Sequence, residues 1–219
     1  MNERVLVVCG HPDDEALGCG GTIAKHSAAG DYVFVMTFTN GVSARGYTIT
    51  DTDRKNAFES ACRILGVGNT WQGHYADNEM DTASLLSYTK DIENVMRDAK
   101  PTTVYTHHLH DLNIDHQLVA QATRVACRPQ PGCIVQKLLH FEVASSSEWG
   151  GRFAPNYFVV LDADLLAKKL AAFACYADEV REYPHPRSRT GLEDLAHWRG
   201  ASIGVRAAEA FECERIIVP

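Results

Sequence analysis

The sequence lacks three features that would place it in a specialised class of protein. It has no C-x-x-C pair among its seven cysteines, no excess of basic residues, and no apolar run long enough to span a membrane. The cysteines are odd in number and scattered, which indicates buried thiols in a reducing compartment rather than disulfides or a zinc knuckle. The net charge of −7 leaves no positive field to attract nucleic acid or an anionic lipid surface.

The beginning of the chain is also poor in apolar residues. Met1 to Arg4 is followed by only five of them, too few for a signal peptide, so we expect a cytoplasmic protein. With 219 residues, of which 45% are hydrophobic and 22% charged, the chain is expected to fold as one domain over residues 1–219. The oligomeric state is left open, a homo-oligomer included.

The first forty residues have the pattern of a βαβ unit. Val5 to Cys9 is a short β-branched run typical of a buried parallel strand, a helix is expected over 16–29, and Tyr32 to Thr39 is the second expected strand. Gly30 is a natural C-terminal cap for the helix. A crossover of this kind makes the two strands parallel and the connection right-handed.

The rest of the chain continues this alternation of strands and helices, with no linker or repeat that would separate domains. We expect helices over 51–65, 82–99, 115–127, 164–177 and 191–199, strands over 102–106, 135–143 and 157–161, and loops over 40–50 and 128–132. The sequence therefore predicts a single-domain α/β fold with a mostly parallel, Rossmann-like sheet flanked by helices. In such sheets ligands bind at the carboxyl ends of the strands.

The first expected strand leads directly into the segment His11-Pro12-Asp13-Asp14-Glu15. Carboxylates in the first turn of a helix often only cap it and complement its dipole, and Glu15 fits that role as well as a functional one. His11 followed by two aspartates favours a site, because one Asp can cap the helix while the other faces the crevice with His11.

A second polar cluster follows the strand expected over 102–106; its members are His107, His108, His110, Asp111, Asn113, Asp115 and His116. One histidine and one carboxylate from the first segment, with one histidine from the second, would form a three-ligand site that keeps a position open for water, as catalytic zinc sites do. The carboxylate ligand leaves manganese, iron or cobalt as alternatives. A carboxylate next in sequence to a ligand is placed to take a proton from an activated water, so the pattern favours metal-dependent hydrolysis.

The glycines of Gly18 to Gly21 raise the alternative of a nucleotide-cofactor oxidoreductase. Their spacing is not G-x-G-x-x-G, and the polar segment 11–15 occupies the turn that a pyrophosphate would approach. We therefore regard this as the weaker hypothesis.

Two stretches, GHPDDEALGCGGTIAKH and THHLHDLNIDHQLVA, together resemble the LmbE-like (PIG-L-like) metal-dependent N-deacetylases, which remove acetyl groups from amino-sugar moieties. The later segments FEVASSSEW, YPHPRSRTGLEDLAHWRG and AEAF are similar to one bacterial branch of that family. The resemblance implies a zinc site with His11, Asp14 and His116 as ligands. It also implies Asp13 as the general base and Asp115 as a support for the site.

The sequence departs from the family pattern at one position. Family members with an H-x-D-H motif have a histidine two residues before the aspartate, where this chain has Asn113. Either Asn113 hydrogen-bonds the oxyanion, or another imidazole acts as the acid. His185 and Arg187 lie in a loop stiffened by two prolines and are the candidates for donating the proton and for binding an anionic part of the substrate; the alternative is a surface turn before a helix.

Arg54 lies near the start of an expected helix and resembles a family position that meets the sugar hydroxyls, the alternative being an exposed helix residue. The sequence thus predicts a zinc-dependent hydrolase that removes an acetyl group from a small N-acetylated amino sugar. A metal-dependent sugar-binding protein without turnover is the other hypothesis, but it would not need Asp13 beside the ligands.

Overall fold

Seven strands form one sheet within residues 2–42 and 49–218, which the computed structural model describes. Residues 43–48, part of the loop expected over 40–50, lie outside the described residues. The strands are β1 (Arg4–Cys9), β2 (Tyr32–Thr39), β3 (Asn69–Tyr75), β4 (Thr103–His107), β5 (Lys137–Phe141), β6 (Tyr157–Val160) and β7 (Ala208–Ile216). Their order across the sheet is β3-β2-β1-β4-β5-β7-β6.

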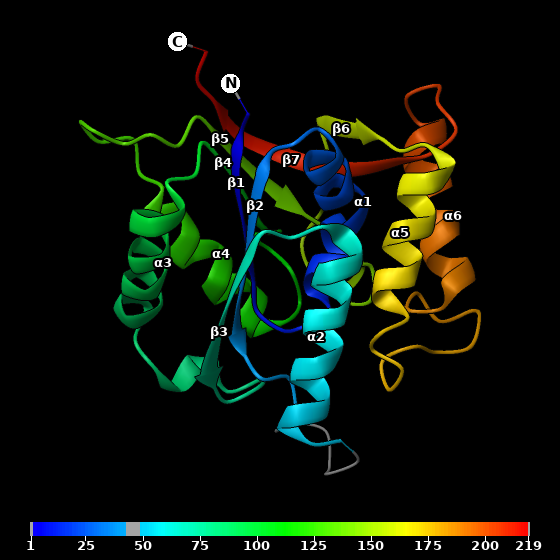
Figure 1. Cartoon of the computed structure of the whole chain (residues 1–219), viewed down its shortest axis with the longest axis horizontal. Coiled ribbons are helices and arrows are strands. Elements are labelled where there is room, and N and C mark those ends of the chain that lie inside the picture. The colour runs from blue at the N-terminus through cyan, green and yellow to red at the C-terminus, as the bar shows by residue number, and fades with distance from the viewer. Residues whose placement is uncertain (1, 43–48, 219) are drawn as a thin grey trace.

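Helices cover both faces of this sheet (Figure 1). They are α1 (Asp14–Ala28), α2 (Asp51–Leu65), α3 (Leu85–Ala99), α4 (Ile114–Ala126), α5 (Ala163–Phe173) and α6 (Arg189–Ala201), with 3-10 turns at Met80–Thr82 and Ser147–Trp149. Helices α3 and α4 pack on one face, and α1, α2, α5 and α6 lie on the other (Figure 1). The predicted single-domain α/β fold is confirmed.

The alternation of side chains in the central strands explains the two-layered core. Val5 and Val7 of β1 face the cluster that includes α1, α2 and α5, while Leu6 and Val8 face the cluster that includes α3 and α4. Strands β1 to β5 pair in parallel, as expected, so the carboxyl ends of β1 and β4 lie side by side. That edge is where the two polar segments of the sequence meet.

Two strands were not predicted from the sequence. The first, β3, pairs in parallel with β2 at one edge of the sheet. The second, β7, inserts antiparallel between β5 and β6, so the sheet is mixed rather than wholly parallel. Other elements differ from expectation only at their ends: α1 begins at Asp14 rather than at residue 16, and β5 is shorter than the range 135–143.

Helix α1, which begins at the site, is broken at Cys19, whose backbone is not helical. Glu209 of β7 accepts hydrogen bonds from the backbone N–H groups at Gly21 and Thr22, at 3.0 and 2.6 Å, and so caps the second half of the helix. Lys169 of α5 donates to the carbonyl of Leu17 at 2.7 Å and pairs with Glu209 at 2.6 Å. The buried ion pair therefore satisfies backbone groups on both sides of the break.

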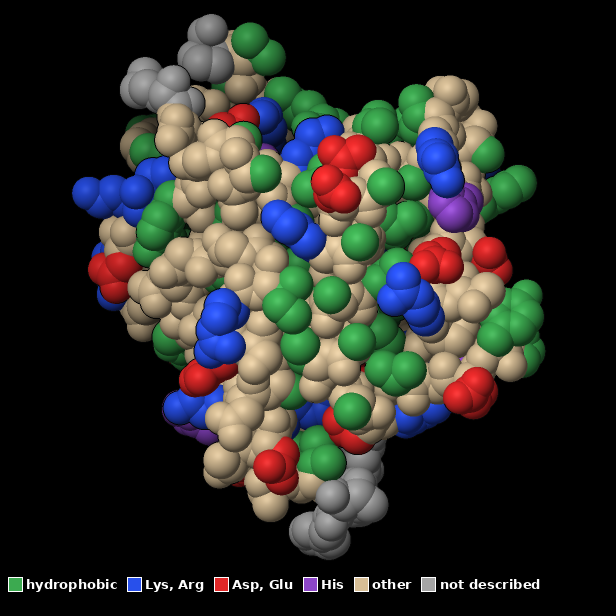
Figure 2. Space-filling view, turned by 45° about the vertical axis from the view of Figure 1, so that its right-hand side comes forward, with side chains coloured by type: hydrophobic (Ala, Val, Ile, Leu, Met, Phe, Trp, Pro, Cys, Tyr) green, Lys and Arg blue, Asp and Glu red, His purple; other side chains and the backbone are tan. Residues whose placement is uncertain are grey.

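The surface carries charges of both signs. On the face drawn in Figure 2, basic and acidic side chains are interspersed among the described residues, without a continuous basic area. None of the helices within residues 2–42 and 49–218 has the length and apolar character needed to cross a membrane.

Candidate active site

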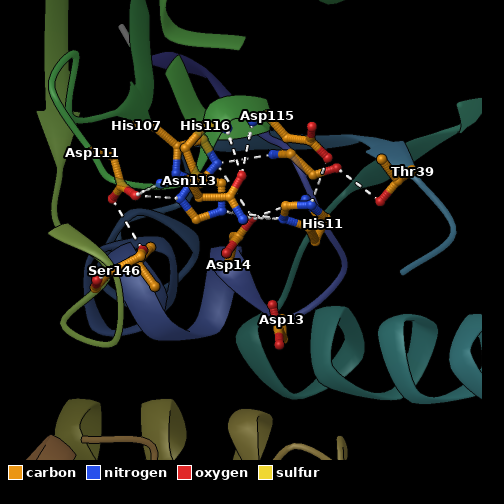
Figure 3. A network of polar contacts seen from close by, with 12 residues as sticks. His11, Asp13, Asp14, Thr39, His107, Asp111, Asn113, Asp115, His116 and Ser146 are labelled. Carbon is orange, nitrogen blue, oxygen red and sulfur yellow. Dashed lines mark hydrogen bonds and ion pairs between the residues drawn. The ribbon is translucent and has the colours of Figure 1, made fainter. Parts of the chain in front are cut away.

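Three side chains from the two polar segments converge at the carboxyl ends of β1 and β4 (Figure 3). His11 follows β1, Asp14 begins α1, and His116 lies in the first turn of α4. Nδ1 of His11 lies 3.2 Å from Oδ2 of Asp14 and 3.1 Å from Nε2 of His116. The remaining distance, from Nε2 of His116 to Oδ2 of Asp14, is 3.4 Å.

This spacing fits a divalent cation. Zinc bonds of about 2.0–2.1 Å at tetrahedral angles place neighbouring ligand atoms about 3.3 Å apart. Oδ1 of Asp14, the oxygen outside this triangle, is also buried without a hydrogen-bond partner among the described residues, so the carboxylate has acceptor capacity left for a cation. The set of two imidazole nitrogens and one carboxylate oxygen is typical of catalytic zinc sites and also accepts manganese, iron or cobalt.

The charges of the cluster favour a cation as well. Burial alone would lower the pKa of His116, but the neighbouring Asp14 and Asp111 carboxylates outweigh it and raise the pKa to about 9. In His11, hydrogen bonds to surrounding carboxylates likewise outweigh burial and raise the pKa well above its usual range. The site thus attracts positive charge, which a bound metal would supply.

A carboxylate supports the outer nitrogen of each histidine ligand. Nε2 of His11 lies 3.0 Å from Oδ2 of Asp115, and Nδ1 of His116 lies 3.2 Å from Oδ1 of Asp111. Such a partner fixes the tautomer and leaves the other ring nitrogen facing the metal position. Asp115 is where the family resemblance placed a supporting residue, whereas no such role was predicted for Asp111.

Asp77 also contacts the site and was not predicted from the sequence. It lies after β3, a strand that was itself missed, and its Oδ1 is 3.1 Å from Nε2 of His11. A single aspartate in a loop forms no sequence motif, so its proximity to His11 is known only from the folded structure.

His107, at the end of β4, is buried behind the ligands. Its ring stacks on that of His116, with centroids 3.9 Å apart and planes 14° apart. Its Nε2 accepts a hydrogen bond from the backbone N–H at Gly10, at 2.9 Å, and lies 3.3 Å from Oδ2 of Asp14. Burial lowers the pKa of His107 to about 4, so it is a neutral packing partner of the ligand ring.

The other histidines of the second segment lie apart from the ligand cluster. Nδ1 of His108 contacts Glu212 of β7 at 2.7 Å, and Nε2 lies 3.3 Å from the carbonyl of Gly151. His110 is exposed. His116, by contrast, places Nε2 3.1 Å from Nδ1 of His11.

Asp13 lies next to the ligand cluster and is only 3% exposed. Its backbone has a left-handed φ of 118°, and its side chain makes no capping hydrogen bond to α1, contrary to the expectation that one of the two aspartates caps the helix. Oδ1 is buried without a hydrogen-bond partner within the described residues. Burial raises the pKa of Asp13 to about 6, against the lowering effect of Arg187, which leaves the carboxylate able to exchange protons near neutral pH.

Two arginines approach the same small cavity, which is lined by His11, Pro12, Asp13, Gly41, Arg54, Asp77, Asn78, Asn113, Glu179 and Arg187. Nη1 of Arg187 donates to Oδ2 of Asp13 at 3.0 Å and to Oε2 of Glu179 at 2.7 Å. Arg54 is buried, not exposed on its helix, and its Nη2 donates to Oε1 of Glu179 at 2.7 Å and to Asp178 at 2.6 Å. Both arginines therefore line the cavity while pairing with the protein's own carboxylates.

Asn113 caps α4 and also lines the cavity. Its Oδ1 accepts from the backbone N–H of Asp115 at 2.8 Å, and its Nδ2 donates to Oδ1 of Asn78 at 3.1 Å. His185, by contrast, is exposed and is not among the residues that line the cavity. Its Nδ1 accepts the backbone N–H of Arg187 at 3.0 Å, so its role as a proton donor stays a prediction.

Glu15 is fully buried and supports the turn that carries Asp13. Its Oε2 accepts the backbone N–H of Asp13 at 3.1 Å, and its Oε1 accepts the hydroxyl of Tyr176 at 2.5 Å. Burial raises the pKa of Glu15 to about 8. Glu15 is therefore neither a simple helix cap nor a ligand. Its two contacts join the backbone of Asp13 to the side chain of Tyr176.

Comparison with known proteins identifies the family of this chain. The family described as PIG-L, GlcNAc-PI de-N-acetylase, matches residues 6–127, which hold both polar segments. The chain belongs to the PIG-L family. The uncharacterized deacetylase YaiS of Escherichia coli is 32% identical over 172 residues, which make up 77% of this chain and 87% of YaiS.

A further relative and a solved structure of similar fold cover different lengths of the chain. The 1D-myo-inositol 2-acetamido-2-deoxy-alpha-D-glucopyranoside deacetylase of Salinispora arenicola is 29% identical over 58% of this chain, which spans 50% of that enzyme. The solved structure of the N,N'-diacetylchitobiose deacetylase from Pyrococcus horikoshii has a TM-score of 0.79 and 22% identity, covering 97% of this chain and 84% of that one. The predicted membership of a deacetylase family is therefore confirmed, and with it the prediction that the chain is an enzyme.

Proposed function

We propose that this PIG-L family protein is a zinc-dependent hydrolase that removes the acetyl group from a small N-acetylated amino sugar. The observation that carries the proposal is the triangle of His11, Asp14 and His116 ligand atoms, 3.1–3.4 Å apart. Asp13 directly precedes Asp14 and lines a cavity together with His11. Deacetylases that act on N-acetylated sugars occur among both the relatives and the similar structures, which supports the substrate class.

In this proposal His11, Asp14 and His116 hold the zinc ion. When bound, zinc supplies a water of lowered pKa and polarises the carbonyl of the acetamide. Asp115 and Asp111 keep the two imidazoles oriented for this task through their outer nitrogens.

Asp13 is the general base. Its Oδ1 has no partner among the described residues and is therefore the oxygen left to accept the proton of the attacking water. After the attack the same carboxyl group returns the proton to the leaving amine. Asp13 suits both steps better than His185 because it lines the cavity, whereas His185 does not.

Asn113 is the donor for the oxyanion that forms during the attack. Its Nδ2 carries two hydrogens, and one of them is used by Asn78. The second hydrogen is left for the substrate, since Asn113 lines the cavity. Arg54 lines the same cavity and is proposed to contact the sugar hydroxyls.

The test is a panel of N-acetylated sugars, including N-acetylglucosamine and N,N'-diacetylchitobiose, assayed for released acetate and primary amine. We expect metal-free protein to be inactive and one equivalent of zinc to restore release of both products in equal amounts. Stoichiometric zinc binding with no acetate from any member of a broad panel would favour the sugar-binding alternative, and activity that survives complete removal of metal would contradict the proposal.

A further inference from the structure

The guanidinium of Arg187 is held by three segments of the chain. Besides Asp13 and Glu179, which share its Nη1, it uses its Nε to donate to the hydroxyl of Ser145 at 2.9 Å. Because a guanidinium is planar, contacts at two of its nitrogens fix both its position and its plane. The side chain is largely buried, with 14% of its surface exposed, so it has little freedom to turn toward a ligand.

Glu179 holds the two arginines apart. One of its oxygens accepts from Arg187 and the other from Arg54, which is itself buried. Without this carboxylate, Arg54 would keep only Asp178 and Arg187 only Asp13 as an acidic partner, and nothing would bridge the two guanidinium groups. Glu179 therefore determines where the Arg187 guanidinium can lie.

The contacts close a ring that begins and ends at Asp13. Arg54 lies over the ring of Tyr176, with its central carbon 5.8 Å from the ring centre, and the Tyr176 hydroxyl donates to Glu15. Glu15 in turn accepts the backbone N–H of Asp13. Asp13 is thus held at its backbone from one side and at Oδ2 from the other, while Oδ1 is left without a partner among the described residues.

We propose that Arg187 and Glu179 are positioning residues for Asp13: Arg187, held in place by Glu179, binds Oδ2 and leaves Oδ1 as the oxygen that takes the proton from the attacking water. The inference rests on the proposed function, in which Asp13 is the base. It gives Arg187 a different task from binding an anionic part of the substrate. A buried carboxylate oxygen without a partner is costly, and such atoms are kept where they serve function.

The two tasks of Arg187 lead to different kinetics. If it positions Asp13, Arg187→Ala lowers kcat by about 10²-fold, the scale expected for a displaced reacting group, and leaves KM and bound zinc near the parental values. If it binds the substrate, the same variant mainly raises KM. Glu179→Gln is expected to lower kcat by about tenfold through Arg187.

Asp178→Asn is the matched control. Asp178 neighbours Glu179 and contacts the same Arg54, whereas the side-chain contacts of Arg187 within the described residues go to Asp13, Glu179 and Ser145. We expect this variant to keep kcat within about twofold of the parent. If kcat of Asp178→Asn falls as far as that of Glu179→Gln, the loss of any negative charge near Arg54 has this effect. That result would overturn the assignment of Glu179 as a positioning residue.

A double-mutant cycle decides whether Arg187 acts through Asp13. With zinc-loaded enzyme and N,N'-diacetylchitobiose, or whichever panel sugar the parent hydrolyses fastest, Arg187→Ala should cost about twofold or less once Asp13→Asn is already present. If the double variant instead loses the product of the two single-variant factors in kcat, Arg187 acts independently of Asp13. That result would overturn the inference while leaving Asp13 as the base. A fully active Asp13→Asn variant would instead overturn the proposed function.

Crystal structures give a readout that needs no substrate. In Arg187→Ala we expect the Asp13 side chain to take another rotamer or several, whereas in Asp178→Asn it should stay in place. Arg187→Lys, which keeps the charge without the planar fork, serves if the alanine variant fails to fold, with the same displacement expected. An Asp13 carboxylate that keeps its position without the guanidinium would contradict the proposal.

Discussion

Oδ2 of Asp115 accepts a hydrogen bond from Nε2 of His11 at 3.0 Å, and the backbone N–H groups at Asn78 and Met80 hold the same carboxylate at 2.8 and 3.2 Å. These two backbone contacts fix the position of the Asp115 carboxylate, and the carboxylate in turn orients the ring of His11. This leaves Nδ1 of His11 facing Asp14 and His116, where the ligand triangle forms.

The first prediction follows from this contact. Asp115→Ala should weaken zinc binding or lower the rate by about ten- to a hundredfold, because His11 keeps only Asp77 of the two carboxylates that contact its Nε2. Asp91→Ala, at a position on α3, serves as the aspartate control. Isothermal titration with zinc checks the prediction, and an unchanged affinity together with an unchanged rate would show that Asp115 does not support the ligand.

The second prediction concerns the choice of histidine. His116→Ala should lose zinc under limiting metal, since two protein ligands remain where three are proposed. His110→Ala, an exposed position on the same segment, should keep full occupancy. Metal content measured after dialysis distinguishes the two. If His116→Ala retains stoichiometric zinc, another histidine must be the ligand, and His107, whose Nε2 lies 3.3 Å from Oδ2 of Asp14, is the first to test.

The third prediction concerns His185. Its exposure, its absence from the cavity lining and its lowered pKa, caused by partial burial and the nearby arginines, all disfavour it as the donor to the leaving amine. We expect His185→Gln to keep the parental rate and the shape of the pH profile of kcat/KM. Loss of the alkaline limb with zinc content intact would instead support the donor role predicted from the sequence.

The fourth prediction concerns stability and pH. Burial raises the pKa of Glu15 from an ordinary 4.5 to about 8, so between these values the folded chain holds a proton that the unfolded chain releases. The free energy of unfolding of the metal-free protein should therefore fall as the pH rises from about 5 to 8. Glu15→Gln should remove this part of the slope, whereas Glu59→Gln, at an exposed position of α2, should not. Urea unfolding at several pH values checks it, and equal slopes in parent and Glu15→Gln would contradict the account.

The elements that the sequence predicts best are those whose signal is local. The central strands β1 and β2 are continuous apolar runs because both of their faces are covered. Edge strand β3, Asn69–Tyr75, is mostly polar and contains a glycine, so no alternation reveals it. In β7, four of nine residues are charged, and partners such as Lys169 for Glu209 and His108 for Glu212 exist only in the folded chain.

The same distinction applies to the candidate site. His11, Asp13 and Asp14 lie on one short turn and His116 at one helix start, so two motifs are enough to suggest a joint site. Asp77 and Glu179 lie in loops and reach the cavity only through the packing of β3 and of the chain after α5. Nothing near them in the sequence marks them, and the same holds for the hydroxyl of Ser145 that anchors Arg187.

The central claim is that Asp13 is the base beside a zinc ion held by three other side chains, and the rate of acetate release by zinc-loaded Asp13→Asn tests it most directly. The substitution removes the proton acceptor and keeps all three proposed ligands, so the zinc content should equal that of the parent while the rate falls by two to four powers of ten. Parental acetate release by a variant with full zinc content would contradict the account.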